Sequence, residues 1–180
     1  MEQRIENEIK YKINHFETPL GLMTAISEPE GIFTLDFNDS INLNPAIQNL
    51  IMNSEFEEDA HLVQVKREIE EYFSGMRKKF TVRLSMHGTD FQKKVWTELL
   101  KIPYGSTRTY SQQAIALKDI RSIRAVAAAN GKNKIAIIIP CHRVIGSDGS
   151  LTGYAGGLWR KKWLLEFESA VESPVLFDSV

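Results

Sequence analysis

The chain of 180 residues is 43% hydrophobic and 25% charged, has a net charge of −1, and contains no apolar run near the roughly 18 residues that a membrane span needs. Its single cysteine excludes an internal disulfide and a cysteine-rich zinc site, so the thiol serves either packing or chemistry. Residues 1–88 carry 9 Lys/Arg against 15 Asp/Glu, whereas residues 89–168 carry 13 against 6. This split fits a polyanion-facing module joined to a neutral or acidic one, and it fits equally well a solvated face on which charges cluster by chance.

The start of the chain predicts a small sheet. Residues 1–13 alternate charged and apolar residues and lack the apolar centre of a signal peptide, so we expect a cytoplasmic protein. Apolar and polar residues also alternate across residues 9–37, with Pro and Gly between the runs, as in antiparallel strands. We therefore predict a meander of short strands at the start of an α/β (α+β) protein.

A helix and a last strand complete the N-terminal half. Between residues 44 and 79, apolar side chains recur at intervals of three and four, which predicts an amphipathic helix with Glu68 and Glu70 on its solvent face. Residues 80–86 return to a period of two, which predicts a strand. The apolar positions of the helix are Leu62, Val65, Ile69, Tyr72 and Phe73.

A second amphipathic helix opens the C-terminal half. Thr89 and Asp90 offer side-chain oxygens for its N-cap, and Pro103 and Gly105 stop it. Its start and stop signals predict a helix that packs one face on the core. The predicted core-facing stripe is Phe91, Val95, Trp96, Leu99, Leu100 and Ile102.

Two short helices follow, at residues 109–117 and 122–130, with Gly131 at the C-terminal cap of the second. A connection of about four residues between them fits a helix-turn-helix. Residues 135–139 are too apolar for a solvated strand, so we predict a buried one.

A glycine-rich loop at residues 146–157 precedes the closing helix, which is predicted to pack Leu158, Trp163, Leu164, Leu165 and Phe167 on the core. These elements divide the chain into three parts. We expect an N-terminal α/β domain at 1–88, a C-terminal domain at 89–170 and a tail at 171–180.

The second short helix carries little side-chain bulk, because four of residues 125–129 are alanine, and its backbone can therefore approach another surface closely. Packing against a sheet is the plainer interpretation of the alanines alone. Arg124 stands against it, since a helix-turn-helix protein places such side chains where they reach a DNA groove. The cations and aromatic ring nearby are typical of a phosphate-contacting surface: Arg108, Tyr110, Arg121, Lys132 and Lys134.

Cys141 follows Pro140 and precedes His142. A reactive thiol needs a neighbour, such as an imidazole or a cation, that lowers its pKa below about 8.5. Adjacent side chains of a strand point to opposite faces, so contact with His142 requires a turn, which Pro140 favours, or a bridging water. On these residues alone, a buried and unreactive thiol is the default.

The motifs around the cysteine are, in chain order, GTDFQKKVW (88–96), IPYGSTRTYSQQ (102–113), RAVAAANGKN (124–133), IPCHRVIG (139–146) and GYAGGLWRKKWLLEFE (153–168). This series resembles the O6-alkylguanine-DNA alkyltransferases, the methylated-DNA–protein-cysteine methyltransferases. The resemblance covers about Thr89 to Glu168, whereas the N-terminal half shares only its length and strand-helix outline. It implies a ribonuclease H-like outline for the first domain and a winged helix-turn-helix in the second.

The resemblance implies that the two short helices bind the minor groove of duplex DNA. Arg124 takes the place of a nucleotide swung out of the stack, and Tyr110 crowds the neighbouring phosphate. Ala125 and Ala128 let the second helix lie close to the DNA backbone, and Ser111 joins the DNA contacts. The implied pocket for the flipped base includes Asn130, Val144 and Ala155.

For the chemistry, the resemblance implies a relay in which His142 takes the proton of Cys141 through water and Glu168 orients the imidazole. Asn133 lies close to the sulfur and braces the turn. Arg143 is a structural cation in the family, not a proton donor.

The leaving guanine also needs donors, and the resemblance assigns this role to the Tyr154 hydroxyl and the backbone N–H of Ala155. Attack of a thiolate on an sp3 carbon leaves a thioether that water cannot hydrolyse, so Cys141 is not regenerated. We therefore expect each molecule to repair one lesion without a cofactor or a metal. The expected lesions are O6-alkylguanine and also O4-methylthymine.

Lys134 departs from the family, many members of which have proline there, so we expect a less rigid turn and one more cation near the DNA. The zinc site of some relatives has no cysteines to form it, so His15, His61 and His87 are expected to be surface or core histidines. The expected partner is double-stranded DNA that contains O6-alkylguanine, with no membrane and a monomeric state.

Three other functions compete with this one. A non-catalytic lesion-binding protein of the same fold would replace the cysteine, so Cys141 argues against it. A cysteine hydrolase would leave Arg124 and the alanines unexplained, and it would turn over. A transcription factor would use the same helix-turn-helix with basic flanks.

Overall fold

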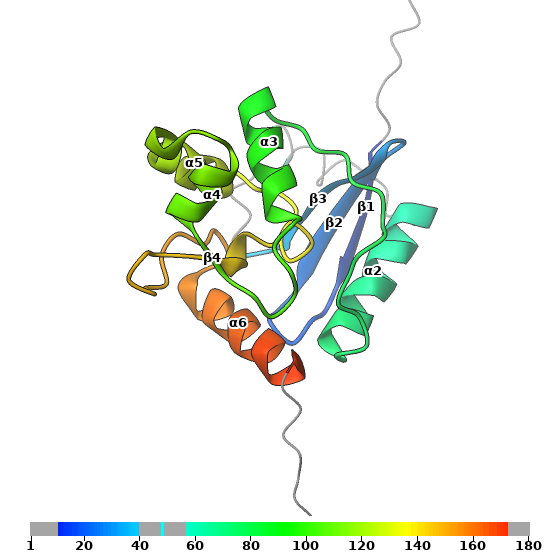
Figure 1. The fold of residues 1–180 in the computed structure, drawn as a ribbon. Helices are drawn as coiled ribbons and strands as arrows, with labels where there is room; N and C mark the ends of the chain where they lie inside the picture. Colours follow the sequence, from blue (N-terminus) through cyan, green and yellow to red (C-terminus); the bar gives the residue numbers. More distant parts are fainter. Residues whose placement is uncertain (1–10, 40–47, 49–56, 173–180) are drawn as a thin grey trace, which may run out of the picture.

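The computed structural model describes residues 11–39, 48 and 57–172. The parts of our predictions that fall elsewhere, namely the first ten residues, the start of the helix predicted from residue 44 and the end of the tail, lie outside the described residues. Figure 1 shows a three-stranded sheet beside a group of helices, which is the mixed α/β fold predicted. None of the described helices is long and apolar enough to cross a membrane.

The predicted meander is confirmed. Strands β1 (Lys12–Phe16), β2 (Met23–Glu28) and β3 (Gly31–Phe37) form an antiparallel sheet in the order β1-β2-β3. Gly31 has a φ of +144°, and a Cβ at this position would lie 2.5 Å from the carbonyl oxygen of Arg83. The tight passage between β2 and β3 therefore requires glycine.

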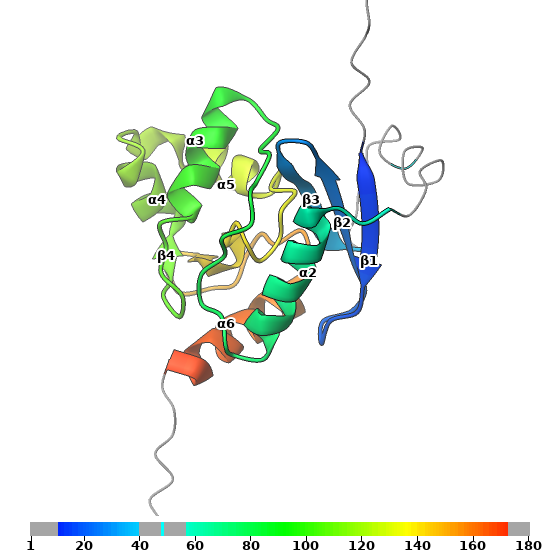
Figure 2. The same ribbon diagram turned by 90° about the vertical axis from the view of Figure 1, so that its right-hand side faces the viewer.

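Helix α2 (Ala60–Phe73) lies along one face of the sheet (Figure 2). Its N-cap is Asp59, which accepts the backbone N–H of Leu62. Glu70 is exposed as predicted, but the same prediction is wrong for Glu68, which is fully buried. Its carboxylate accepts the backbone N–H groups of Thr81 and Val82, so a partner distant in sequence compensates for the burial.

The strand predicted at residues 80–86 is absent from this described segment. Residues 80–86 form a single parallel bridge to β3, between Leu84 and Ile32. A different segment forms another bridge to β3, between Ile135 and Leu35. Both bridges use the edge of β3 that β2 leaves free. The free edge of β3 is thus shared by two segments, and each of them forms a single bridge instead of a ladder.

Helix α3 (Asp90–Leu99) begins with a capping box between Thr89 and Gln92. It ends at Leu99, before the predicted stop at Pro103. Phe91 and Leu100 are exposed, contrary to prediction, because they lie at the two ends of the helix, beyond the packed turns.

The helix-turn-helix is present. Helix α4 (Tyr110–Ala116) is joined to α5 (Ile123–Asn130) through a short 3-10 helix, η1 (Ile120–Ser122). The N-cap of α4 is Thr109, again in a capping box, and Gly131 caps α5 as predicted.

Residues 135–139 are buried as predicted, but they do not form a strand. After the bridge at Ile135 the chain turns on itself: Ile137 has a φ of +69°, and Ile139 N–H donates to the Ile135 carbonyl at 3.1 Å. The apolar run belongs to the core, as its composition predicts. Its backbone N–H groups donate partly within the turn and partly to the Leu35 carbonyl of β3 and the Asn133 side chain.

A 3-10 helix, η2 (Cys141–Arg143), follows the apolar turn. It leads into β5 (Val144–Ile145), which pairs in parallel with β4 (Arg108–Thr109). The closing helix is α6 (Leu158–Glu172); its Leu164 is fully buried, but Leu158 is 48% exposed, contrary to prediction, because it stands at the first position of the helix.

Candidate active site

Cys141 stands at the first position of η2, with only 7% of its surface exposed. The turn that Pro140 was expected to introduce is present, since Pro140 precedes η2 directly. The sulfur accepts a hydrogen bond from the amide Nδ2 of Asn133 at 3.2 Å. The predicted closeness of Asn133 to the sulfur is therefore found in the structure.

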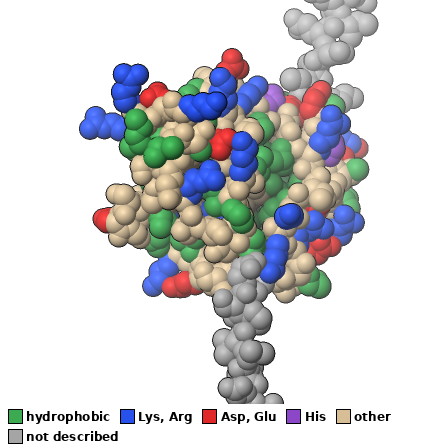
Figure 3. Space-filling model, in the orientation of Figure 1, with side chains coloured by type: hydrophobic (Ala, Val, Ile, Leu, Met, Phe, Trp, Pro, Cys, Tyr) green, Lys and Arg blue, Asp and Glu red, His purple; other side chains and the backbone are tan. Residues whose placement is uncertain are grey.

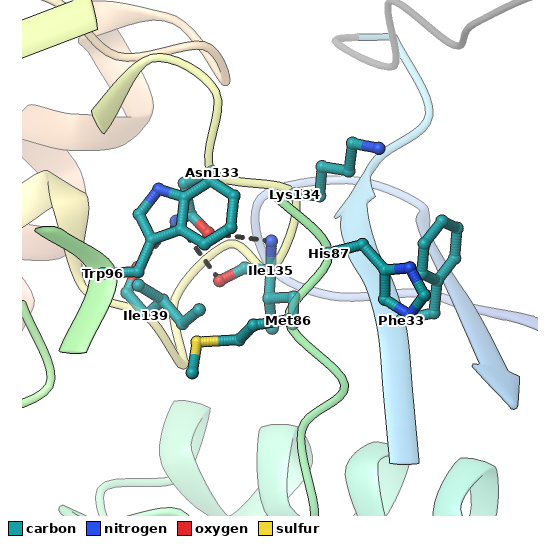
Figure 4. Close-up of a pocket in the computed structure, with 8 residues that line it drawn as sticks. All are labelled: Phe33, Met86, His87, Trp96, Asn133, Lys134, Ile135 and Ile139. Carbon is teal, nitrogen blue, oxygen red and sulfur yellow. Dashed lines mark hydrogen bonds between the residues drawn. The ribbon is translucent and has the colours of Figure 1, made fainter. Parts of the chain in front are cut away.

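Asn133 braces the turn as well as the sulfur. Its amide donates to the Ile139 carbonyl at 2.9 Å, and its Oδ1 accepts the Ile135 N–H at 3.0 Å. Figure 4 shows this side chain beside a small cavity of about 10 Å³, lined also by Trp96 of α3 and Phe33 of β3. Lys134 places its ammonium 5.2 Å from the Phe33 ring centre, so it packs toward the N-terminal sheet.

The thiol is neutral at rest. Burial raises the pKa of Cys141 to about 11, although the hydrogen bond from Asn133 and the charge of Lys161 act in the opposite direction. A base must therefore take the thiol proton before the sulfur can act as a nucleophile.

His142 is fully buried next to the thiol, and its Nε2 lies 2.9 Å from Glu168 Oε1. Burial alone would raise the pKa of Glu168, but the hydrogen bonds and charges of His142 and Arg143 hold it at about 2. Arg143 donates to both carboxylate oxygens at 2.9 Å, and Tyr72 of α2 donates to Oε1 at 2.8 Å. The carboxylate is therefore ionised and fixed from three directions.

The contact between Glu168 and His142 Nε2 determines which nitrogen of His142 is basic. Burial lowers the pKa of His142, so the ring is neutral. Because the ionised Glu168 can only accept, Nε2 carries the proton and Nδ1 keeps its lone pair. Nδ1 is buried and has no hydrogen-bond partner among the described residues. The side chain beside Cys141 is thus a neutral imidazole with an available basic nitrogen.

Tyr154 brings a second polar atom into the same interior. Its hydroxyl is buried without a hydrogen-bond partner in the described chain, and its ring lies edge-on to His142 at 6.4 Å between centres. Burial, and then the charge of Cys141, raise the pKa of Tyr154 well above 10. A Cβ on Gly156 would lie 2.8 Å from the Tyr154 ring, so this loop needs glycine. Tyr154 therefore stays protonated and is available as a donor.

The sequence reasoning missed Lys161, which is fully buried in α6. Its Nζ donates to the carbonyl of Thr152 at 2.6 Å and to that of Val144 at 2.5 Å. A signal was present, because Lys161 lies three and seven positions before Leu164 and Glu168, and both of those residues face the interior.

The predicted DNA-contacting residues lie on α4 and α5. Arg124, Ala125 and Ala128 are exposed, so packing of these alanines against the sheet is wrong. Tyr110 is partly buried and donates to the Thr152 carbonyl at 3.1 Å, and Ser111 lies 2.9 Å from the Thr109 hydroxyl. Figure 3 shows Lys and Arg side chains projecting at the edge of the molecule where these helices lie.

The three predicted pocket residues have different surroundings. Asn130 is buried and exchanges two hydrogen bonds with Gln113, at 2.8 and 3.3 Å, which joins α4 to α5. Val144 is fully buried, whereas Ala155 is exposed in the glycine-rich loop. The structure brings Val144 next to the reactive turn and gives Asn130 a role in joining the helices.

The three N-terminal histidines do not gather at one place that could hold a metal among the described residues. His15 contacts the Thr24 hydroxyl at 2.8 Å, and His87 contacts Glu28 at 2.6 Å. His61 lies on α2.

Two family models match the chain. Residues 10–86 match the ribonuclease-like domain, and residues 90–170 the DNA binding domain, of 6-O-methylguanine DNA methyltransferase. A methylated-DNA–protein-cysteine methyltransferase of Methanosarcina barkeri is 46% identical over 152 residues, covering 84% of this chain and 93% of the relative. The constitutive enzyme of that name from Bacillus subtilis is 41% identical over 155 residues, covering 84% and 92%.

Solved structures agree with this result. The crystal structure of Mycobacterium tuberculosis O6-methylguanine methyltransferase has a TM-score of 0.80 and 36% identity, covering 92% of this chain and 96% of that one. A crystal structure of the M. tuberculosis protein OGT in complex with DNA has a TM-score of 0.77 and 37% identity, covering 89% and 93%.

Proposed function

The chain belongs to the 6-O-methylguanine DNA methyltransferase family, and on that premise we propose that Cys141 accepts the alkyl group of O6-alkylguanine in one irreversible transfer. The chain is a DNA-binding repair enzyme with methylated-DNA–protein-cysteine methyltransferase activity. The observation that carries the proposal is the buried Cys141 beside a neutral His142, whose other nitrogen is held by an ionised Glu168.

The first step is removal of the thiol proton. Since the pKa of Cys141 is raised to about 11 by burial, few molecules hold a thiolate at neutral pH. His142 Nδ1 takes the proton through one water molecule, and the imidazolium that forms is stabilised by Glu168 at 2.9 Å. Asn133 keeps its hydrogen bond to the sulfur, which favours the anion.

The second step transfers the alkyl group. The thiolate attacks the alkyl carbon, the sulfur–carbon bond forms as the carbon–O6 bond breaks, and the electron pair goes to the guanine. The Tyr154 hydroxyl donates toward the purine ring and the Ala155 N–H toward O6, where negative charge develops. The unpartnered hydroxyl of Tyr154 supports this role, because a base in the pocket supplies the acceptor it lacks.

The product is a thioether, which has no carbonyl for water to attack. Cys141 is therefore consumed, each molecule repairs one lesion, and no cofactor takes part. The same geometry serves O4-methylthymine, whose methyl group is also bound to a ring oxygen.

For access to a base inside a duplex, the nucleotide must leave the stack. Arg124 fills the gap, while exposed Ala125 and Ala128 let α5 approach the DNA backbone. Tyr110 and Ser111, at the start of α4, contact the phosphate beside the rotated nucleotide. Unstacking costs a few kcal/mol and least for a damaged base, which adds selectivity.

The proposal is tested by mass spectrometry of the protein after incubation with duplex DNA that contains one O6-methylguanine. We expect one methyl group on Cys141, a stoichiometry of one, and no gain in the Cys141→Ala variant. Repeated turnover would point to a hydrolase, and an unchanged mass with retained lesion binding would point to a non-catalytic lesion-binding protein.

A further inference from the structure

Lys161 brings an ammonium group into the interior beside the reactive turn. The residue is fully buried, and its Nζ donates to the carbonyls of Val144 and Thr152 at 2.5 and 2.6 Å. Val144 follows η2 directly, and Thr152 precedes Tyr154 by two residues in the glycine-rich loop. The ammonium thus ties the turn that holds the thiol to the loop that holds the proposed proton donor.

The buried charge has no carboxylate partner in the part of the chain that the structure describes. Burying an ammonium group is unfavourable, and proteins usually offset this with an anion. No ion pair found among the described residues includes Lys161, whereas the neighbouring Lys162 pairs with Glu166 at the surface. Burial lowers the pKa of Lys161 to about 8, and the opposing influence comes from the charge of Cys141. Lys161 Nζ is held by the carbonyl of Val144, the residue directly after the turn that carries Cys141. From this position, the anion that Lys161 can compensate is the thiolate.

Other groups around the thiol do not take this role. Asp36 on β3 carries a negative charge that raises the pKa of Cys141, whereas Lys161 lowers it. The pKa values of Tyr110 on α4 and Tyr154 in the loop are raised, so both stay neutral. His142 is the proposed proton acceptor, and becomes a cation only after the thiol has ionised.

The carbonyl of Thr152 joins Lys161 to the DNA-binding helices. It accepts from Lys161 and also from the Tyr110 hydroxyl, at 3.1 Å, and the ammonium lies 6.0 Å from the centre of the Tyr110 ring. If a DNA phosphate displaced Tyr110, the Thr152 carbonyl would lose one of its two donors, and the same carbonyl orients the ammonium.

We propose that Lys161 is a positioning residue that stabilises the Cys141 thiolate formed before alkyl transfer and fixes the loop that carries Tyr154. This rests on Cys141 being the alkyl acceptor. The thiol proton goes to His142, and Lys161 keeps its own proton throughout.

The test measures the reaction of the chain's single cysteine with iodoacetamide as a function of pH, by mass spectrometry. Lys161→Gln keeps amide donors for the two carbonyls and removes the charge, and Lys161→Met removes both. Lys162→Met, one residue away and exposed, is the matched control. Circular dichroism melting shows which variants are folded.

For Lys161→Gln we expect the midpoint of alkylation to rise by about one pH unit, equal to about a tenfold slower reaction near neutral pH. Lys162→Met should follow the unsubstituted protein. A folded Lys161→Gln with an unchanged pH profile would overturn the proposal, and this variant decides the matter even if Lys161→Met does not fold. Because iodoacetamide needs no DNA, failure of methyl transfer from DNA would refute the proposed function separately.

Discussion

The turn around Cys141 and the exposed face of α4 and α5 fix their functional side chains in opposite ways. Glu168 is 1% exposed and is bonded to His142, Arg143 and Tyr72. Arg124 and its neighbouring alanines stand exposed on α5. The proposed reacting groups are thus ordered without DNA, while the exposed Arg124 would acquire its partners from the DNA. Substitutions in the interior should change reactivity and stability. Substitutions on the exposed face should change only the affinity for duplex DNA and the rate of transfer from it.

The largest effect is expected for Cys141→Ala. Methyl transfer from O6-methylguanine should be lost completely, while affinity for the methylated duplex, measured by fluorescence anisotropy, should stay within about threefold, a difference under 1 kcal/mol. The variant separates interior chemistry from surface binding. An equal loss of DNA affinity would mean that the two regions are not independent.

Glu168→Gln should be the next most severe change. The buried Arg143 loses its charged partner, which is expected to cost about 3–5 kcal/mol of unfolding free energy, and His142 loses the negative charge that stabilises its protonated form. Urea denaturation measures the first effect. The control is Glu166→Gln, an exposed residue on the same helix, which should cost less than about 1 kcal/mol.

The same carboxylate makes stability depend on pH. The pKa of Glu168 is about 2 in the folded protein, against an ordinary value of 4.5. Its stabilising contribution is therefore complete above pH 4.5 and is lost as the pH falls toward 2. Melting temperatures of the unsubstituted protein should drop more steeply through this range than those of Glu168→Gln, and parallel curves would contradict the assignment.

Arg124→Ala tests the exposed face of α5. We expect transfer from duplex DNA to slow by about tenfold, equal to about 1.4 kcal/mol of barrier, because nothing fills the gap of the rotated nucleotide. Reaction with free O6-benzylguanine should change little. Rates on both substrates are compared by single-turnover kinetics, and equal losses on the two would remove the proposed role.

The smallest effects are expected for substitutions of two alanines of α5. Ala128→Leu places bulk on the exposed face, so stability should stay within about 0.5 kcal/mol while duplex affinity weakens. Ala129→Leu places the same bulk in the core, where Ala129 is 3% exposed, and should cost about 1–3 kcal/mol. Urea denaturation should therefore show the larger effect for Ala129→Leu. Fluorescence anisotropy with duplex DNA should show the larger effect for Ala128→Leu.

Much of the fold follows from local signals. The N-cap residues Thr89 and Thr109 and the cap at Gly131 mark helix ends that the structure contains. The failures concern residues whose partners are distant in sequence. Glu68 lies on a polar position of its helix, yet it is buried because the backbone of residues 81–82 supplies donors. Residues 135–139 have the composition of a strand, but two segments share the free edge of β3.

The reactive residue types, their order and the alanine-rich helix can be read from the sequence alone, because they depend on composition and on spacing along one element. The packed fold, by contrast, makes the His142 ring neutral with Nδ1 available, and it buries Lys161 without a carboxylate partner among the described residues. These properties arise from burial and from contacts such as Tyr72 with Glu168, which join residues 96 positions apart. Such contacts leave no periodic trace in the sequence, because they are made only when the elements pack.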